Sequence, residues 1–565
     1  MAISHASAPN RLWFVGWTIL ILASCGGSTP HDGITSPSSP VSPTISAVLP
    51  ASEVAGDWNV ILTIVGSAFV SSSYVRWNAG GRDTQFVNSN RLTATLLDSD
   101  IAAVGTAQIS VVNADTGMTS NAVSFQIDAI RGQGDGDSFS SSVSWGGRFV
   151  AFESDSTNLV PGDTNGAFDI FLRDTCITAA SGCTPSTIRV SVASDGTEAN
   201  GPSRLLSITP DGRFVLFSSD ATNLVIGDDN GVSDLFVRDT CFGAVPSCTP
   251  STSRISLAND GAEANGPNWD GTISADGRFI AFSSEATNLV PNDSNGFRDV
   301  FRRDTCTGAT VCTPSTTLVS VADDGSQGNA MSREASISAD GRYIAFSSAA
   351  TNFVVTPPGY VNGIFIRDTC SGAPLGCTPS TMLSSPQSEL PAEFTAPFLS
   401  ADARYVSYCS TPVPNQSSTK ATLSDTCLGV NGDCSPHEVL SWDAIYCTDT
   451  KLGGDARYLA YTGWLGWPRD AILSVSLVDT CVGAGSECAP GILATFGKYD
   501  PLDHPGTGDA FAPAISPDGS YLSFSSDWNH FAEFDSNGKN DVFLVGVCPL
   551  NCTATIRISV ASDSP

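Results

Sequence analysis

The sequence is poor in the residues that most enzymes and nucleic-acid-binding proteins use. It has five histidines in 565 residues, and 27 lysines and arginines against 57 aspartates and glutamates, a formal charge of −30. It contains neither a Gly-x-Ser-x-Gly nor a His-Glu-x-x-His motif, which argues against the common hydrolases. A chain this acidic, without a cluster of basic residues, repels phosphate backbones, which argues against nucleic acid as a partner.

The apolar stretch near the N-terminus is too short to span a membrane. Leu12 to Ala23 is twelve residues long, whereas the bilayer core is ~30 Å thick, and such a length is typical of a signal peptide. The stretch ends in Leu22-Ala23-Ser24-Cys25, which resembles the lipobox of bacterial lipoproteins. The resemblance implies a signal peptide at 1–24 and acylation of Cys25. Because Gly26 and not Asp follows, it also implies sorting to the outer membrane. An ordinary secreted protein with a chance cysteine is the alternative.

A segment rich in Gly, Ser, Thr and Pro follows at residues 25–42. It has almost no large apolar residues and cannot bury a core, so we expect a flexible tether. The sequence therefore predicts an envelope protein that a lipid on Cys25 holds to the membrane, facing either the periplasm or the exterior.

The seventeen cysteines follow a regular pattern. Fourteen lie in close pairs, two more form a possible eighth pair, and Cys25 is left over. Regular pairing of this kind predicts disulfides and an oxidising compartment. Zinc is the competing interpretation, but structural zinc sites place cysteines about two to four residues apart, with a second pair nearby. The expected pairs are Cys176/Cys183, Cys241/Cys248, Cys306/Cys312, Cys370/Cys377, Cys427/Cys434, Cys481/Cys488, Cys548/Cys552 and Cys409/Cys447.

Residues 43–128 form short alternating runs of apolar and polar residues. Turn residues separate these runs, a pattern that predicts a β-sandwich. The segments PTISAVLP, IVGSAFVSSSYVRWN, RLTATL, GTAQISVVN and SNAVSFQI resemble an IPT/TIG immunoglobulin-like domain. The resemblance implies a spacer or an adhesive module without catalytic residues. We expect a spacer, and direct binding of a partner is the alternative.

One strand motif recurs seven times between residues 135 and 563. In the copy DGRFIAF, side chains alternate with a period of two after an Asp276-Gly277 turn. The copies are 53 to 65 residues apart and each supplies four short strands, which predicts propeller blades. The phrases ISADGRYIAFSS and ISPDGSYLSFSSD resemble TolB-type propeller repeats, distant relatives of the Trp-Asp-repeat family. The copies begin at Gly146, Asp211, Asp276, Asp340, Asp402, Asp455 and Asp518.

The predicted fold class is therefore all-β. We expect a seven-bladed β-propeller of four-stranded blades at 135–563, after the immunoglobulin-like sandwich at 43–128. Six blades, as in TolB itself, are the alternative, which requires that one motif be discarded. The repeats begin just before an innermost strand at Ser140–Trp145 and end with an outermost strand at Ile556–Ala561. We therefore expect the ring to close by apolar packing of whole blades, without a strand exchanged between the first and the last.

An acidic pattern recurs in the loop between the second and third strands of four repeats. Carboxylates and amides on a tight Gly-containing loop are calcium ligands, so calcium is one interpretation. The spacing is shorter than in the calcium loops of other propellers and no Glu closes the loop. The alternative is an Asn-Gly turn whose Asp side chains cap backbone amides. The residues are Asp163, Asn165 and Asp169, then Asp228, Asn230 and Asp234, then Asp293, Asn295 and Asp299, and finally Asp535, Asn537 and Asp541.

The fifth and sixth repeats lack this acidic loop and carry large aromatic residues instead, at Trp442, Tyr446, Trp464 and Trp467. Exposed aromatic side chains stack on sugars or anchor a protein partner, which makes these four candidate binding residues. The alternative is that they fill gaps in degenerate repeats.

Two functions follow from these observations. The first is a non-catalytic binding or scaffold protein that presents a disulfide-stapled propeller, which calcium would stabilise, to a protein or glycan of the envelope. The second is an envelope hydrolase or lyase that cleaves glycan or peptide at a metal-assisted site in the propeller mouth, with Asp side chains and His504 or His530. A mouth that collects three or more carboxylates or histidines favours the enzyme, and an apolar or aromatic mouth favours the binding protein.

Overall fold

The structure is a computed structural model. It describes residues 41–50, 52–54, 60–101, 105–128, 132–180, 182–355, 362–385, 392–412, 419–429, 434–465, 472–485, 488–497, 509–528, 538–547 and 555–561. In these residues the secondary structure is β, apart from two single-turn 3-10 helices at Asp98–Asp100 and Trp145–Gly147. No helix in this part of the chain has the length and apolar character needed to cross a bilayer. The predicted signal peptide and lipidated Cys25 lie outside the described residues.

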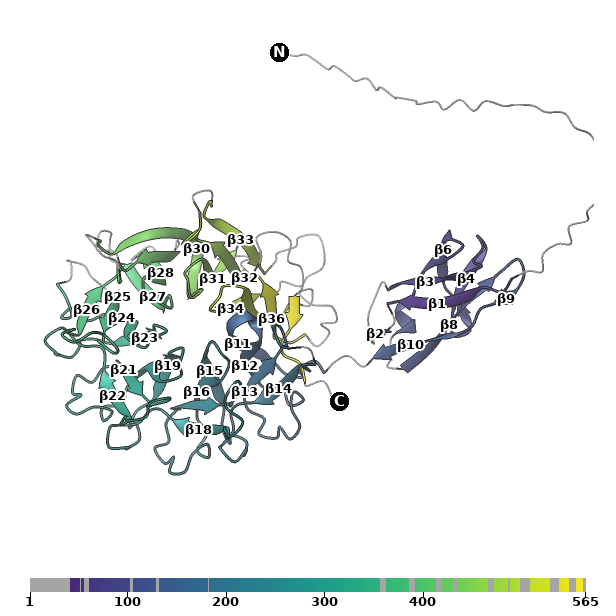
Figure 1. Cartoon of the computed structure of the whole chain (residues 1–565). Helices are drawn as coiled ribbons and strands as arrows, with labels where there is room; N and C mark the ends of the chain where they lie inside the picture. The colour runs from purple at the N-terminus through teal and green to yellow at the C-terminus, as the bar shows by residue number, and fades with distance from the viewer. Residues whose placement is uncertain are drawn as a thin grey trace, which may run out of the picture. The chain divides into compact units, whose positions relative to one another are not determined.

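The first domain contains two β-sheets, as in an immunoglobulin-like domain (Figure 1). In β4, alternate side chains are buried, which matches the alternation in the sequence. The first sheet has the order β1 (Thr44–Leu49), β3 (Ile61–Ser67), β7 (Arg91–Thr95) and β6 (Asp83–Asn88). The second has the order β2 (Ser52–Val54), β10 (Val123–Asp128), β8 (Gly105–Asn113), β4 (Ser73–Trp77) and β5 (Gly80–Gly81), with β9 (Met118–Thr119) beside β8.

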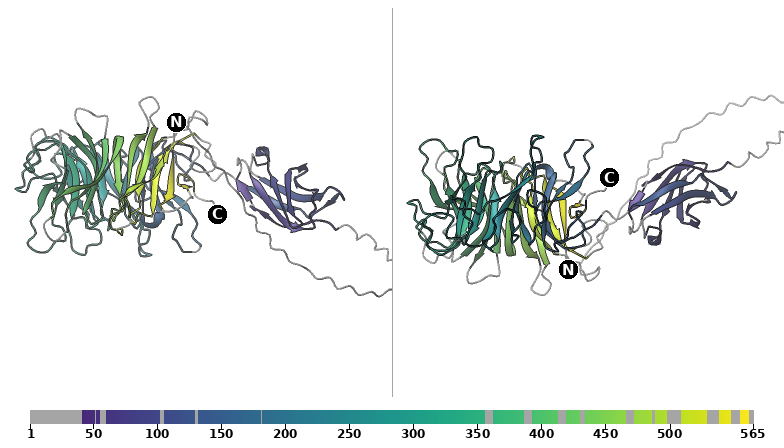
Figure 2. Two further views of the ribbon diagram at one scale, coloured as in Figure 1. Left: turned by 90° about the horizontal axis from the view of Figure 1, so that it is seen from above. Right: turned by 90° about the horizontal axis from the view of Figure 1, so that it is seen from below.

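The second domain is a β-propeller, in which sheets are arranged around a central axis (Figures 1 and 2). Five of its sheets have four antiparallel strands that follow one another in sequence. The first two sheets are β11 (Ser138–Val143), β12 (Phe149–Ser154), β13 (Asp169–Asp174) and β14 (Ser186–Arg189), and then β15 (Ser203–Ile208), β16 (Phe214–Ser219), β17 (Asp234–Asp239) and β18 (Ser251–Arg254). The next two are β19 (Asn268–Ile273), β20 (Phe279–Ser284), β21 (Asp299–Asp304) and β22 (Ser315–Leu318), and then β23 (Ser332–Ile337), β24 (Tyr343–Ser348), β25 (Gly363–Asp368) and β26 (Ser380–Leu383). The last is β34 (Ala510–Ile515), β35 (Tyr521–Ser526), β36 (Asp541–Gly546) and β37 (Thr555–Arg557). We call the first four of these sheets the first to fourth blades.

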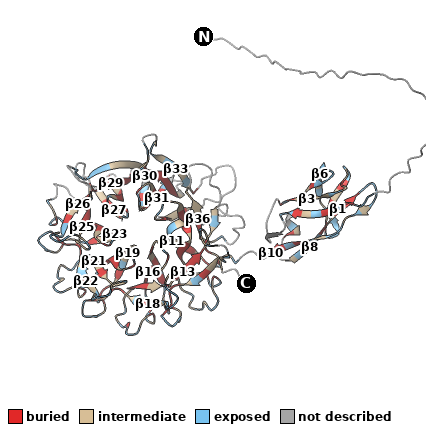
Figure 3. Cartoon of the chain, viewed as in Figure 1, coloured by how far each residue is buried: buried red, intermediate tan, exposed pale blue. Residues whose placement is uncertain are grey.

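Each blade buries both faces of its middle strands (Figure 3). All six residues of β20 are buried, because neighbouring blades cover the sheet from both sides. Within the third blade, Phe282 of β20 pairs with Phe301 of β21, and their rings stack with centroids 5.8 Å apart. The same Phe–Phe pair recurs as Phe152/Phe171, Phe217/Phe236, Phe346/Phe365 and Phe524/Phe543.

The fifth and sixth repeats do not form separate sheets, contrary to the expectation of four-stranded blades throughout. They share a seven-stranded sheet of β27 (Ala392–Leu399), β28 (Tyr405–Pro412), β29 (Thr419–Asp425), β30 (His437–Leu452), β31 (Tyr458–Leu465), β32 (Ile472–Asp479) and β33 (Gly491–Phe496). The 16-residue β30 pairs with β29 up to Ala444 and with β31 from Ile445. This strand contains no Gly or Pro to turn the chain, and the spacing between motifs is shortest here.

The ring closes partly through the backbone of its two ends. Gln133 and Val560 form an antiparallel bridge, and the Ala561 N–H donates to the Gly132 carbonyl at 2.8 Å. Val192 and Glu198 form the corresponding bridge inside one connection between blades. Within the described strands none is exchanged between the first and last sheets, as expected, and apolar side chains of both sheets pack together. The expectation of closure by packing alone was incomplete, because these backbone hydrogen bonds add to it.

The paired phenylalanines should account for much of the propeller's stability. We expect Phe301→Ala to lower the free energy of unfolding by about 3–5 kcal/mol, because Phe301 is fully buried. Phe297→Ala is the matched control, since that side chain is 45% exposed and should change stability by less than about 0.5 kcal/mol. Urea unfolding curves measure both, and an equal effect of the two substitutions would contradict this packing.

Candidate functional site

The antiparallel blades give the propeller two different faces. The turns between first and second strands and between third and fourth strands lie on one face, which we call the turn face. The loops between second and third strands, and the connections between blades, lie on the other, which we call the loop face. The cysteine pairs therefore lie on the turn face and the acidic loops on the loop face.

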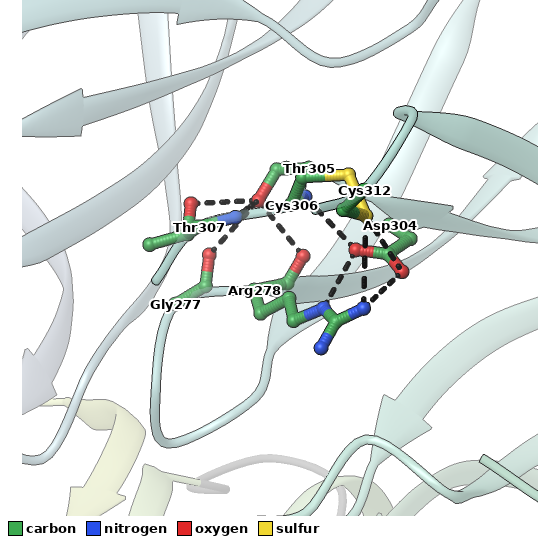
Figure 4. The surroundings of a disulfide bond; sticks show 7 residues. All are labelled: Gly277, Arg278, Asp304, Thr305, Cys306, Thr307 and Cys312. Atoms are coloured by element: carbon green, nitrogen blue, oxygen red, sulfur yellow. Dashed lines mark hydrogen bonds and ion pairs between the residues drawn. A yellow bond between two sulfur atoms is a disulfide. The ribbon is translucent and has the colours of Figure 1, made fainter. Parts of the chain in front are cut away.

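On the turn face an Arg–Asp pair holds each disulfide turn (Figure 4). In the third blade, Arg278 Nε and Nη2 donate to the Asp304 carboxylate at 2.9 and 2.8 Å, and the Cys306 N–H donates to it at 2.9 Å. Burial alone would raise the pKa of Asp304, but these hydrogen bonds lower it below its usual value. The same pair recurs as Arg148/Asp174, Arg213/Asp239, Arg342/Asp368, Arg404/Asp425 and Arg457/Asp479.

Seven disulfides occur in the described residues, and each joins a pair expected from the sequence. Their Cα atoms lie 5.6 to 5.8 Å apart, the usual spacing for such bonds. Six close the turn between the third and fourth strands, at Cys176–Cys183, Cys241–Cys248, Cys306–Cys312, Cys370–Cys377, Cys427–Cys434 and Cys481–Cys488. Cys409–Cys447 instead joins β28 to β30. Cys548 and Cys552 lie outside the described residues.

On the loop face, an arginine lies among the acidic residues of the first blade. Arg189 Nη1, from the last residue of β14, lies 3.3 Å from Asp163, 3.2 Å from Asp169 and 2.6 Å from Glu198. Asn165 donates to Asp169 at 2.9 Å, and its side-chain oxygen accepts the Ala167 N–H. The guanidinium thus supplies a positive charge where calcium was one interpretation, and the Asn-Gly turn caps its own backbone.

The pKa values of Asp163 and Glu198 in this cluster shift in opposite directions. Burial raises the pKa of Asp163 to about 6, even though the Arg189 charge opposes the shift. Glu198 is more exposed, and hydrogen bonds from Thr164, Asn165 and Arg189 outweigh its burial and lower its pKa to about 2.

The second blade repeats this arrangement. Arg254 lies within 3.2 Å of Asp228, Asp234 and Glu263. Asn230 again donates to Asp234, at 2.8 Å.

The third blade keeps the acidic residues but lacks the arginine. Leu318 stands at the position of Arg254, and Gln327 stands at that of Glu263. Asp299 is fully buried, and burial raises its pKa to about 6, while Ser320 and Asn295 donate hydrogen bonds to it. Burial also raises the pKa of Asp293. Calcium remains a prediction for this loop.

The fourth predicted loop is described only in part. Asp541 lies 3.5 Å from Arg557. Arg557 occupies the position in its sheet that Arg189 occupies in the first blade. Asp535 and Asn537 lie outside the described residues. The arginines could have been found in the sequence by aligning the fourth strands of the repeats, which read STIR, STSR, STTL and TIR.

The central channel is narrow and mostly uncharged. The innermost strands line a cavity of about 170 Å³ with residues such as Ser142, Ser207, Thr272, Ser336 and Phe398. Lys451, from β30, is the one charged residue in its described lining.

Three carboxylates join neighbouring blades by accepting hydrogen bonds from backbone N–H groups. The Leu205 N–H donates to Glu153 at 3.0 Å, the Ala335 N–H to Asp270 at 3.1 Å and the Ala396 N–H to Glu334 at 2.8 Å. Each carboxylate thus accepts a hydrogen bond from a backbone N–H at the edge of the next blade's innermost strand. Burial raises the pKa of Glu153. These hydrogen bonds bind the three carboxylates to the scaffold, and a gathering of carboxylates in the channel mouth, which would favour the enzyme, stays a prediction. His504 and His530 lie outside the described residues.

The predicted aromatic set separates into two kinds. Tyr446 is 52% exposed and Trp464 is 36% exposed. Both lie at the loop-face ends of the first two strands of the sixth repeat. Trp442 packs partly buried against a core cluster that contains Cys409 and Cys447, which agrees with the gap-filling alternative. Trp467 lies outside the described residues.

The structure also shows an exposed apolar patch on the loop face of the third blade that sequence reasoning missed. Trp269 is 49% exposed and lies under the Arg298 guanidinium, 4.7 Å from its carbon to the ring centroid. The neighbouring Phe297 is 45% exposed and Met331 is 42% exposed. The Ser332 N–H donates to the Arg298 carbonyl at 2.8 Å and so holds Met331 beside this group. We call Trp269, Phe297, Arg298 and Met331 the blade-3 patch.

Comparison with known proteins identifies the smaller domain. Residues 43–127 match the family described as IPT/TIG domain. No curated protein sequence matches the chain.

Solved structures resemble the chain only distantly. A putative TolB from Agrobacterium tumefaciens is 14% identical, with a TM-score of 0.31, over 55% of this chain and 84% of that one. The propeller domain of the Trilobed protease from Pyrococcus furiosus is 10% identical, with a TM-score of 0.38, over 76% of this chain and 99% of that one. Dipeptidyl peptidase 4 of Porphyromonas gingivalis is 12% identical, with a TM-score of 0.37, over 76% of this chain and 60% of that one. Similarities this weak say nothing about activity.

The arginine clusters on the loop face should make stability depend on pH. Arg254→Leu leaves three carboxylates without their cation, so we expect a loss of about 3 kcal/mol of unfolding free energy near neutral pH. The loss should shrink towards about pH 4, where Asp228, whose pKa is raised to about 6, is protonated.

The converse variant, Leu318→Arg with Gln327→Glu, builds the same cluster in the third blade. There the raised pKa of Asp299 means that the folded state binds its proton more tightly, so stability falls as pH rises through about 6. The added guanidinium should therefore stabilise the protein more near pH 7 than near pH 4. Urea unfolding near pH 7 and near pH 4 tests both variants, Arg254→Leu and the double variant. Changes in unfolding free energy that are the same at both pH values would refute this account.

Proposed function

We propose that this protein is a non-catalytic binding protein of the bacterial envelope. A lipid on Cys25 anchors it, the segment 25–42 tethers it, and the IPT/TIG domain spaces a rigid propeller from the membrane. The propeller then binds a protein partner through its loop face. The blade-3 patch is the observation that carries this proposal.

The composition of the blade-3 patch supports a protein partner. Trp, Met and Arg are enriched at protein interfaces, and interfaces depend on a few such anchors. Trp269, Phe297 and Met331 are all more than 40% exposed. The Arg298 guanidinium lies over the Trp269 ring and forms an ion pair with Glu285 at 3.7 Å. Two features of the propeller keep this surface rigid: the ion pairs and disulfides of the turn face, and the hydrogen bonds between blades.

The charge of the chain supports a partner with a basic surface. A formal charge of −30 attracts positively charged molecules and accelerates their association. We expect binding to weaken as salt rises.

We also propose that the ring has seven blades. The seven-stranded sheet then counts as two blades that share β30. The central cavity supports this count, because β11, β15, β19, β23, β27, β30 and β34 all contribute to its lining.

Site-specific photocrosslinking in intact cells tests the binding surface. A photoreactive phenylalanine analogue at position 297 should give a defined crosslinked protein, and Trp269→Ala should reduce the yield at least about tenfold if Trp269 is an anchor. Trp145→Ala is the matched control, because Trp145 is 62% exposed but belongs to the turn face. Equal loss with both alanine variants, or crosslinks only to glycan, would overturn a protein-binding loop face.

Fractionation tests the anchor separately. Replacing Cys25 by Ala removes the acylated thiol, so the protein should move from the membrane pellet to the soluble fraction while its propeller remains folded. Metabolic labelling with a fatty-acid analogue should mark the unaltered chain alone. Membrane retention of Cys25→Ala would refute the lipid anchor.

A further inference from the structure

The outer edge of each of the first four blades is covered by one recurring contact. The second residue of the outermost strand is a threonine, and its hydroxyl group donates to a carbonyl of the segment that follows the neighbouring sheet. In the second blade, Thr252 donates to the Val192 carbonyl at 2.5 Å, and Arg238 donates to the Ala193 carbonyl at 3.1 Å. The threonine contact recurs as Thr187 with Val560, Thr316 with Leu257 and Thr381 with Val321.

We call each of these covering segments an edge cap. Its third residue satisfies the backbone at the strand edge, as when Ser194 Oγ accepts the Thr252 N–H at 3.0 Å. The same bond joins Thr316 to Asn259 and Thr381 to Asp323. A cap thus consists of an apolar residue, Ala, and then Ser, Asn or Asp: residues 192–194 read VAS, 257–259 read LAN and 321–323 read VAD. The capped threonines are 6% exposed or less.

The outermost strand of the sixth repeat, β33, lacks an edge cap among the described residues. Ile492 stands at the position of Thr252 and Val478 at that of Arg238, because Val478 pairs with Ile492 as Arg238 pairs with Thr252. Neither side chain can donate a hydrogen bond. The edge is exposed instead: Ile492 is 52% exposed, and Leu493, the extra residue of a β-bulge, is 43% exposed.

The continuous strand β30 explains why this cap is missing. In the other blades the cap comes from the segment that follows the neighbouring sheet. Between the fifth and sixth repeats no such segment exists, because β30 runs from one repeat into the other. The outer edge of β33 is therefore the place where the ring lacks a covering segment, and β33 ends its sheet at the outer rim (Figure 1).

β33 also lacks the charged residues and prolines that keep exposed sheet edges from pairing. It reads GILATF, whereas the outermost strands of the first four blades are four residues long. An edge strand presents unpaired N–H and C=O groups to any extended chain beside it. Because the register is the same, the Ile492 N–H points outward as the Thr252 N–H does, and no described residue accepts it.

We propose that the outer edge of β33 binds an extended peptide segment of a partner protein, which takes the place of the missing cap. Extended peptides bind other proteins by adding to an exposed sheet edge. The segment has the residue order of the edge caps: an apolar residue, a small residue, and Ser, Asn or Asp, whose side chain accepts the Ile492 N–H. Ile492 and Leu493 supply apolar contact where Thr and Arg bind the cap in other blades. This edge is separate from the blade-3 patch and does not depend on it.

Fluorescence anisotropy with the full-length protein and a labelled peptide, ISLANDG, tests the proposal. The peptide repeats residues 255–261, which contain one of the edge caps. We expect saturable binding with a Kd of about 0.1–1 mM, since so short a segment gains little beyond the cost of ordering it. A scrambled peptide of the same composition should bind at least about tenfold more weakly, because it lacks the residue order of the caps.

Matched variants locate the site. Leu493→Lys places a charge on the edge and should weaken binding at least about tenfold. Ile188→Lys is the control and should leave binding unchanged, because Ile188 is 37% exposed on β14, whose edge is already capped. Ile492→Pro removes the outward N–H and is a second blocking variant, in case Leu493→Lys disturbs folding.

Three results would overturn the proposal. The first is the absence of saturable binding to the unaltered protein. The second is an equal loss of binding in Leu493→Lys and Ile188→Lys. The third is a concentration-dependent dimer that Leu493→Lys abolishes, measured by analytical ultracentrifugation, because it would assign the edge to a second copy of this chain.

Discussion

The propeller depends on one constraint: each blade is a sheet with two apolar faces. All six residues of β16 and of β20 are buried, which requires a neighbour on each side of the sheet. A row of such sheets would leave two apolar faces exposed, so the first and last sheets must meet. Hydrogen bonds between Gly132–Gly134 and Ser559–Ala561 hold the first and last sheets together. They take the place of the covalent connection that links each other pair of neighbouring blades.

Polar groups at the rim follow from the same constraint. With the core occupied by phenylalanines, charged side chains are left to hold the strand ends. On the turn face, the arginine after the first turn binds the aspartate before each cysteine, for example Arg278 with Asp304. On the loop face, Arg189 and Arg254 bind the acidic loops to the outer strands. Because these ion pairs hold the strand ends, individual positions can differ between blades, as the blade-3 patch and Leu318 do.

Much of the fold could be predicted from local signals in the sequence. The strand motif and the six disulfides that close the turn between the third and fourth strands are short-range features, because each depends on residues close together in the chain. The common sheet of the fifth and sixth repeats was missed because the motif marks the first turn of each repeat and not the connection between repeats. Two features of the sequence signalled it: the lack of Gly and Pro from His437 to Leu452, and the short spacing between the motifs at Asp402 and Asp455.

The candidate sites were harder to predict because they combine distant residues. Arg189 follows Asp163 by 26 positions, and nothing in the acidic pattern itself points to it. Trp269 was overlooked because its position also holds Phe139, Arg204 and Arg333 in other blades, so no repeat pattern marks it as exposed.

Closure of the ring is the claim on which this account depends most. The Cβ of a residue placed at Gly132 would lie 3.0 Å from the Cβ of Ala561. Oxidation of the double variant Gly132→Cys and Ala561→Cys, followed by proteolysis and mass spectrometry under non-reducing conditions, tests it directly. The account predicts a peptide in which the two new cysteines are joined and a melting temperature above that of either single variant. Free thiols at both positions in the folded protein would contradict it.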